Sequence, residues 1–92
     1  METLSLAAIT KELENLKDWS YVDNAIEKKL QFRDFKEALG FIVQMGLLAE
    51  QRNHHPEICN VYNKVTIRLS THDAGGVTTK DMDLAKAIDL LR

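Results

Sequence analysis

The chain has 92 residues, of which 45% are hydrophobic and 28% are charged, and its formal charge is −2. This length fits one soluble globular domain over residues 1–92, and the lack of a basic excess or of an apolar run near ~20 residues argues against nucleic-acid and membrane partners. With a single cysteine and no signal-peptide pattern, we expect a cytoplasmic location.

The first predicted helix spans residues 3–16, where leucine and isoleucine recur at helical spacing. A β-hairpin over residues 19–32 follows, with a two-residue turn at Asp23-Asn24, because both residue types tolerate left-handed backbone. Alternation along the second strand puts Lys28 on the apolar face. We therefore expect this strand to lie near a sheet edge or to have an imperfect register.

A long helix is predicted over residues 34–52, with Asp34 as its N-cap and Glu37 completing a capping-box-like pair. Its expected core stripe consists of residues at helical spacing: Phe35, Ala38, Leu39, Ile42, Val43, Gly46 and Ala49. A second apolar row beside the stripe consists of Phe41, Met45 and Leu48. We favour further core for this second row, with a subunit contact as the alternative.

Pro56 ends the helical region and puts the residues before it on a loop or at the start of a strand. The clearest strand covers residues 61–71, with apolar side chains on one face and polar side chains on the other. If the strand persists for one more residue, His72 projects from its polar face. Residues 73–76 contain two glycines and are expected to form a flexible loop.

A final helix is expected to begin at Thr78, with Asp81 at its third helical position. The order is therefore helix, two strands, helix, a short and a long strand, helix. This order predicts an α+β fold, a single small domain in which an antiparallel four-stranded sheet has helices packed on one face.

All three histidines lie between positions 54 and 72, and His54 and His55 are adjacent. Histidine exchanges protons near neutral pH, so this concentration indicates proton transfer or metal binding. Adjacent side chains on an extended chain point to opposite sides, which disfavours a shared zinc ion. A purely structural role stays open, with one exposed histidine and one favourable at a helix C-terminus.

A cysteine nucleophile is disfavoured, because Cys59 beside Ile58 is expected to be a packed, inert thiol. Ser70 lies outside any recognisable nucleophile elbow, and the Gly75-Gly76 pair is a weak signal for phosphate binding. General acid–base catalysis by the imidazoles is the remaining interpretation.

Residues 49–88 read AEQRNHHPEICNVYNKVTIRLSTHDAGGVTTKDMDLAKAI. This run closely resembles the pterin-4a-carbinolamine dehydratase family. The motifs are an acidic residue ahead of a His-His-Pro-acid core, an Asn-Val-Tyr-Asn segment, a Thr-His strand end and an Asp in the last helix. The resemblance covers roughly residues 16–91. It implies a small α+β hydro-lyase that removes water from 4a-hydroxytetrahydrobiopterin to give quinonoid dihydropterin, in tetrahydrobiopterin recycling.

The resemblance implies catalytic roles for three residues: His54, His55 and His72. It also implies that six residues contact the pterin: Glu50, Asn53, Pro56, Ser70, Thr71 and Asp81. The position of Asn53 is often acidic in the family, and a helix-capping role for Asp81 stays open beside pterin contact. The resemblance also implies that the protein needs no metal and no organic cofactor.

Dehydration needs an acid that protonates the leaving 4a-hydroxyl and a base that takes the N5 proton. We assign these two roles to His55 and His72, in an order that the sequence leaves open, with His54 orienting the site or substituting. The carboxylate of Glu50 suits the donor edge formed by the pterin amino and ring N–H groups.

The implied partners are a small-molecule pterin and further copies of the chain, as a homodimer or homotetramer, with the second apolar row as a candidate interface. Members of the family also act as dimerisation cofactors of a transcription factor, so a non-enzymatic interaction protein is the alternative function. A pterin-recycling enzyme would serve an aromatic amino-acid hydroxylase. A diverged pterin-binding homologue linked to molybdopterin enzymes is a third possibility.

Overall fold

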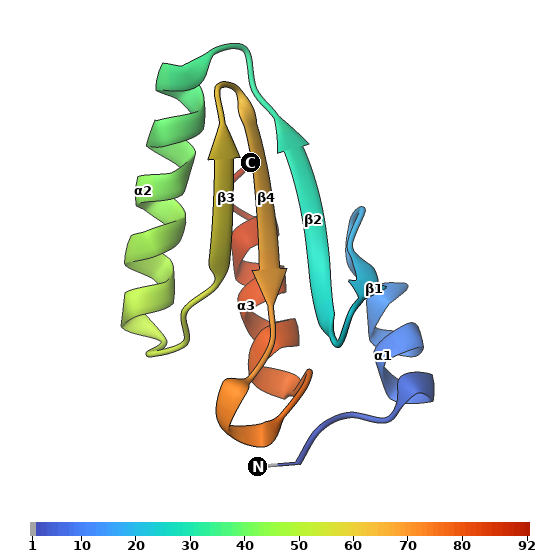
Figure 1. Ribbon diagram of the computed structural model, residues 1–92. Helices are drawn as coiled ribbons and strands as arrows, with labels where there is room; N and C mark the ends of the chain where they lie inside the picture. The colour runs from blue at the N-terminus through green and yellow to red at the C-terminus, as the bar shows by residue number, and fades with distance from the viewer. Residues whose placement is uncertain (1) are drawn as a thin grey trace.

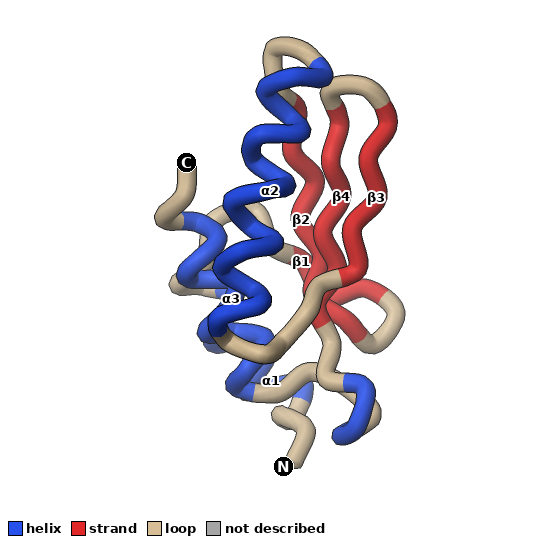
Figure 2. Tube along the Cα trace, turned by 90° about the vertical axis from the view of Figure 1, so that its left-hand side faces the viewer, coloured by secondary structure: helices blue, strands red, loops and turns tan. Residues whose placement is uncertain are grey.

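The computed structural model describes residues 2–92, and Met1 of the predicted domain lies outside the described residues. The elements in chain order are α1 (Leu6–Leu13), β1 (Ser20–Val22), β2 (Ala25–Gln31), α2 (Phe35–Gln51), β3 (Glu57–Val61), β4 (Lys64–Leu69), the 3-10 helix η1 (His72–Ala74) and α3 (Thr79–Asp89). The strands form one antiparallel sheet in the order β1-β2-β4-β3 (Figure 1). The helices lie on one side of this sheet (Figure 2). The predicted α+β class and element order are confirmed.

The core lies between the sheet and the helices, and β4 directs every second side chain into it. Its alternating residues Val65, Ile67 and Leu69 have no exposed surface, whereas the residues between them are partly exposed. Each such apolar side chain stabilises the fold by roughly 1.5–3 kcal/mol when it is fully buried. From α3, the side chains that fill the other half of the core are Met82, Leu84, Ala85 and Ile88.

The buried face of α2 differs from the predicted stripe. Its buried residues are Ala38, Phe41, Met45 and Ala49. The favoured prediction of further core is therefore confirmed for Phe41 and Met45, and the alternative of a subunit contact through them is wrong. Four other apolar residues, spaced one turn apart, are exposed and form what we call the α2 outer row: Phe35, Leu39, Val43 and Leu47. Apolar residues surround more than half of this helix, and periodicity alone could not choose which of them face the sheet.

The short strand and the long strand predicted after the second helix are both present, as β3 and β4, but the predicted bounds of 61–71 for the long strand were wrong. β3 ends at Val61, Tyr62 adopts a left-handed φ of 51°, and β4 begins at Lys64. The Asn60 side chain donates hydrogen bonds to the carbonyls of Tyr62 and Lys64 at 3.1 and 2.9 Å, which closes the turn. Val61 is consequently exposed and does not share the apolar face of β4. A bulky residue rarely adopts this backbone conformation, so the turn had no strong signal in the sequence.

The position of Lys28 agrees with the predicted nearness to a sheet edge. β2 pairs with β1 only over residues 25–27 and with β4 over residues 26–31, so Lys28 has a strand partner on one side only. Its ammonium group is almost buried on the core face, and it lies 2.8 Å from Asp89 Oδ1, which compensates the charge. The prediction of a packed thiol at Cys59 was wrong, because Cys59 is exposed on β3. The first helix is also shorter than predicted, with Ser5 as its N-cap.

Candidate active site

The first turn of α3 holds a buried carboxylate. Asp81 has no exposed surface, and its Oδ2 accepts hydrogen bonds from the Thr78 N–H at 2.8 Å and from Thr71 Oγ1 at 2.9 Å. Thr78 is the N-cap and closes a reciprocal capping box with Asp81. The two threonine hydroxyls are 2.7 Å apart. The predicted capping pair is confirmed, and its carboxylate retains a second oxygen for another partner.

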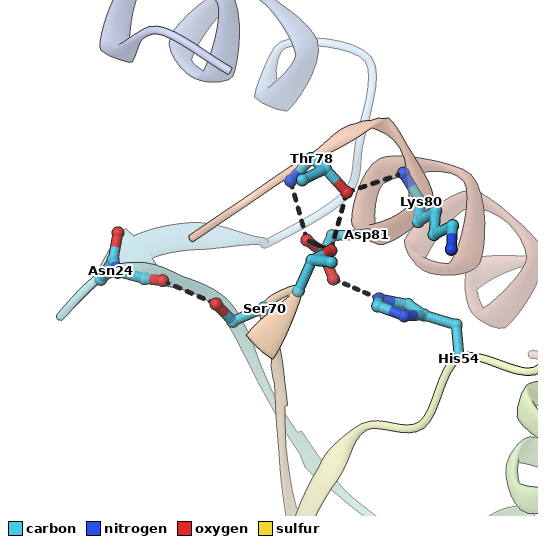
Figure 3. Close-up of polar contacts among 7 residues, drawn as sticks. Asn24, His54, Ser70, Thr78, Lys80 and Asp81 are labelled. Carbon is cyan, nitrogen blue, oxygen red and sulfur yellow. Dashed lines mark hydrogen bonds and ion pairs between the residues drawn. The ribbon is translucent and has the colours of Figure 1, made fainter. Parts of the chain in front are cut away.

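That second oxygen faces His54. The distance between His54 Nε2 and Asp81 Oδ1 is 2.5 Å (Figure 3), and the histidine side chain is only 11% exposed. An ionised carboxylate can only accept hydrogen bonds, so the proton of the contact with His54 must be on Nε2. If the ring is neutral, its Nδ1 is then the acceptor atom. The contact therefore determines both the orientation and the tautomer of the His54 ring.

Asn53 turns the chain so that the two adjacent histidines separate. It ends α2 with a left-handed φ of 50°, and the following His54 N–H donates to the carbonyl of Ala49 at 3.1 Å. Asparagine adopts this conformation more readily than most residues, which gives it a structural reason to occupy the position. After this turn His54 reaches α3, whereas His55 turns back towards α2.

His55 pairs with a second carboxylate at the surface. Its Nε2 lies 2.7 Å from Glu50 Oε1 in the last turn of α2. The two side chains are 56% and 78% exposed, so the pair is accessible to a dissolved molecule. An exposed contact of this kind between a histidine and a carboxylate contributes little to folding, typically below about 1 kcal/mol. Its position beside Pro56 and an open pocket is more informative about chemistry than about stability.

A polar pocket of about 270 Å³ adjoins His55. Its lining residues are Asp23, Asn24, Ala25, His55, Glu57, Arg68 and Ser70. His55 and Ser70 were predicted as site residues, and the other five were missed. The guanidinium of Arg68 lies 3.2 Å from Glu57 and 3.7 Å from Glu27, which compensates its charge inside the pocket. The alternation of Arg68 and Ser70 along one strand face could have predicted that both line the pocket. No sequence pattern indicated that the β1–β2 turn would lie beside them.

His72 lies beyond the end of β4. The strand ends at Leu69, and the exposed His72 begins η1, so the predicted extension of the strand was wrong. The expected flexible loop is instead a hydrogen-bonded turn, in which the Thr71 N–H donates to the Gly76 carbonyl at 2.8 Å. Gly75 has a φ of 82°, which explains the need for glycine. Thr71 connects this turn to the Asp81 network.

A larger pocket, of about 390 Å³, is lined by residues of β2, β3 and β4 that include Lys29 and Lys64, and it contains no histidine. Converging polar groups identify a site better than volume does, so the smaller pocket beside His55 is the stronger candidate. Across residues 2–92, no three His, Cys, Asp or Glu side chains are close enough to hold a metal ion together. In that same range, no helix is both long enough and apolar enough to span a bilayer.

The comparison with protein-family models identifies the chain. The model described as pterin 4 alpha carbinolamine dehydratase matches residues 2–91. The chain belongs to this family. Two curated relatives carry the name "Putative pterin-4-alpha-carbinolamine dehydratase". The protein from Sulfurisphaera tokodaii is 48% identical over 91 residues, which cover 99% of this chain and 98% of the relative. The protein from Bradyrhizobium sp. strain BTAi1 is 50% identical over 93 residues, which cover 99% and 94%.

A solved structure from Brucella melitensis has the same fold as this member of the dehydratase family. Its description reads "transcriptional coactivator/pterin dehydratase". The TM-score is 0.94 at 37% sequence identity, and the match covers 98% of both chains. The arrangement of the sheet and helices described above is therefore that of an experimentally determined relative.

Proposed function

We propose that this protein catalyses the dehydration of 4a-hydroxytetrahydrobiopterin to quinonoid dihydropterin, in tetrahydrobiopterin recycling. The observation that carries the proposal is the divergent His54-His55 pair, in which each imidazole has its own carboxylate and one borders a polar pocket. Membership of the dehydratase family supports the same reaction class. In the reaction the C4a–O bond breaks, the hydroxyl leaves as water after protonation, and N5 loses its proton to a base.

His55 and His72 share the roles of acid and base in this proposal. Both are exposed, so both can exchange protons with a bound pterin and with water. His54 orients the site, because its ring is held against Asp81. Asp81 itself is completely buried and acts behind His54 as a positioning residue. The proposed steps use no metal ion and no organic cofactor.

Glu50 accepts hydrogen bonds from the amino and ring N–H groups of the pterin, a donor edge that suits a carboxylate. Ser70 offers its hydroxyl at the pocket wall, and Asn53, Pro56 and Thr71 shape the segments on either side. Residues 1–92 act as one domain. A single cysteine cannot form an internal disulfide, which is compatible with a cytoplasmic location.

A stopped-flow assay of 4a-hydroxytetrahydropterin dehydration tests the proposal. The wild-type protein is expected to accelerate loss of the carbinolamine far above the uncatalysed rate. The triple variant His54→Ala/His55→Ala/His72→Ala, checked for folding by circular dichroism, is the control and is expected to lose this acceleration. A folded wild-type protein that leaves the uncatalysed rate unchanged would refute the proposal and favour a pterin-binding or interaction role.

We also propose that the chain forms a homodimer or homotetramer through the α2 outer row. Phe35, Leu39, Val43 and Leu47 are between 42% and 64% exposed and repeat along one line of a 17-residue helix about 25 Å long. Such a line can pack against its own copy, and burial of this kind supplements a small core. The coactivator description of the Brucella melitensis structure makes an interaction role a second candidate, or a companion role.

Light scattering at micromolar concentration tests this interface. The wild-type protein is expected to have the mass of a dimer or tetramer, and Val43→Glu is expected to shift it to the monomer. Gln44→Glu introduces the same charge at the next exposed position of α2 and is the matched control. A monomeric wild-type protein, or equal effects of the two variants, would contradict this interface.

A further inference from the structure

The β1–β2 turn is hydrogen-bonded to the loop that carries His72. Asn24 Nδ2 donates to the Gly75 carbonyl at 2.8 Å, across 51 positions of sequence. In the reverse direction, Ser70 Oγ donates to the Asn24 carbonyl at 3.1 Å (Figure 3). The turn therefore contacts the His72 loop at two points, one on each side of η1.

The turn is also held by its backbone geometry and by hydrogen bonds to neighbouring residues. Asp23 and Asn24 have left-handed φ values of 49° and 64°, as a two-residue hairpin turn requires. The Arg68 guanidinium donates to the Asp23 carbonyl at 3.2 Å, which fastens the turn to β4. The Tyr21 hydroxyl donates to Asn24 Oδ1 at 3.3 Å, and this contact orients the amide so that Nδ2 faces Gly75.

The loop approaches the turn closely. A Cβ atom added at Gly76 would lie 3.0 Å from Asn24 Oδ1 and 3.1 Å from Thr3 Cγ2, so only glycine fits there without a shift. From the opposite side, Thr71 binds Asp81 of α3 through its hydroxyl. The segment that carries His72 is thus held from α3 by Thr71 and from the hairpin turn by Asn24.

We propose that Asn24 is a positioning residue of the active site, which keeps the His72 loop in register with the pocket beside His55. Asn24 also lines that pocket, so one side chain connects the two regions that carry the exposed histidines. The inference rests on the proposed function, in which His72 transfers a proton. A displacement of about 1 Å in a reacting group can reduce a rate about a hundredfold, so one hydrogen bond that fixes a loop is sufficient to affect the reaction.

The chain offers a matched control at the other end of the sheet. Asn63, in the β3–β4 turn, donates its Nδ2 to the Phe32 carbonyl at 2.8 Å, the same length as the Asn24 bond. Figure 1 shows the β3–β4 turn at the end of the sheet opposite the β1–β2 turn and the loop that follows β4. Asn24→Asp and Asn63→Asp each replace the donating amide by a carboxylate beside a backbone carbonyl. A purely structural role predicts similar losses of thermal stability in both variants and no difference in activity.

The experiment combines steady-state kinetics with amide hydrogen exchange measured by NMR. Asn24→Asp is expected to lower kcat of carbinolamine dehydration by about tenfold to a hundredfold, with KM changing less than about threefold, and Asn63→Asp is expected to stay within twofold of wild type. Asn24→Gly keeps the left-handed turn without adding a charge, and it separates loss of the hydrogen bond from repulsion. Both Asn24 variants are expected to accelerate exchange of the amides of residues 72–76.

The exchange measurement does not depend on activity, so it distinguishes two failures. An inactive wild-type protein would refute the proposed function, while faster exchange in the Asn24 variants would still support the loop contact. An active wild-type protein with kcat within twofold in both Asn24 variants would overturn the positioning role. Unchanged exchange of residues 72–76 in both variants would overturn it as well.

Discussion

His54 and His55 are adjacent in sequence and each pairs with a carboxylate, yet their surroundings are opposite. The His54–Asp81 pair has side chains that are 11% and 0% exposed, whereas the His55–Glu50 pair has side chains that are 56% and 78% exposed. Breaking a buried pair leaves a polar or charged group without a partner in a low dielectric, whereas water replaces the lost partner of an exposed pair. The difference indicates that one pair holds the site in shape and the other is available for proton transfer.

Removing the exposed imidazole is expected to have the largest effect on activity. His55→Ala should slow dehydration by about two to four orders of magnitude, because a general acid or base contributes that much to a rate. The melting temperature should hardly change, since the side chain is exposed. Stopped-flow kinetics and thermal melts measure the two quantities. A similar rate loss is expected for His72→Ala, and a loss below tenfold in both variants would exclude them as the acid and the base.

Removing the buried carboxylate is expected to have a large effect on stability. Asp81→Ala leaves His54 Nε2, Thr71 Oγ1 and the Thr78 N–H without their acceptor. We expect a loss of about 3–5 kcal/mol in the free energy of unfolding, and a melting temperature lower by more than about 10 °C. Calorimetry or chemical denaturation measures the loss. Asp83→Ala, an exposed carboxylate on the same helix, is the control, and equal losses would remove the distinction between the two pairs.

Neutralising the exposed carboxylate sharpens the comparison further. Glu50→Gln should change the free energy of unfolding by less than about 1 kcal/mol, because the pair with His55 is solvated. KM for the pterin should rise about tenfold, since a charge-assisted hydrogen bond becomes a neutral one. Denaturation curves and initial rates at several substrate concentrations provide both values. An unchanged KM would remove Glu50 from the proposed pterin contacts.

The smallest expected effect concerns the half-buried N-cap of α2. The pKa of Asp34 is lowered from its ordinary value, chiefly because its carboxylate accepts the Glu37 N–H. Desolvation opposes this shift, and the charges of Arg33 and Lys36 add to it. A carboxyl group whose pKa falls on folding stabilises the protein above its unfolded pKa and loses that contribution as the pH falls through the folded value. This contribution is therefore present near neutrality and disappears below about pH 4.

Asp34→Asn keeps a good N-cap and removes only the charge. The melting temperature of wild type should exceed that of the variant slightly at pH 6, and the difference should shrink towards pH 3. Thermal melts across this range measure it. A difference that stays constant with pH would show that the charge of Asp34 does not contribute, in contrast to the buried carboxylate of Asp81.

Local patterns predicted the N-termini of α2 and α3 and one hairpin turn well. The Asp34 cap, the Thr78–Asp81 capping box and the Asp23-Asn24 turn all formed where short-range chemistry placed them. Each depends on hydrogen bonds or backbone preferences within a few residues, so neighbouring residue types were sufficient. The turn at Tyr62 was not predicted, because it uses a backbone conformation that tyrosine rarely adopts.

Longer-range features needed the folded chain. The buried face of α2 was chosen by the sheet beneath it, since apolar residues occupied several possible faces of the helix. Lys28 could be buried on the core face of β2 because Asp89, far away in sequence, compensates its charge. The missed pocket residues Asn24 and Arg68 lie on elements that meet His55 only in the tertiary structure.

The sequence by itself determined the family, the α+β order and the three histidines, because these depend on residue types, spacing and local periodicity. Only the tertiary structure decided which histidine is buried. The turn at Asn53 sends one imidazole to a buried carboxylate and the next to a solvated one. The difference arises because burial and dielectric are properties of packing between distant segments, and adjacent residues in a sequence need not share them.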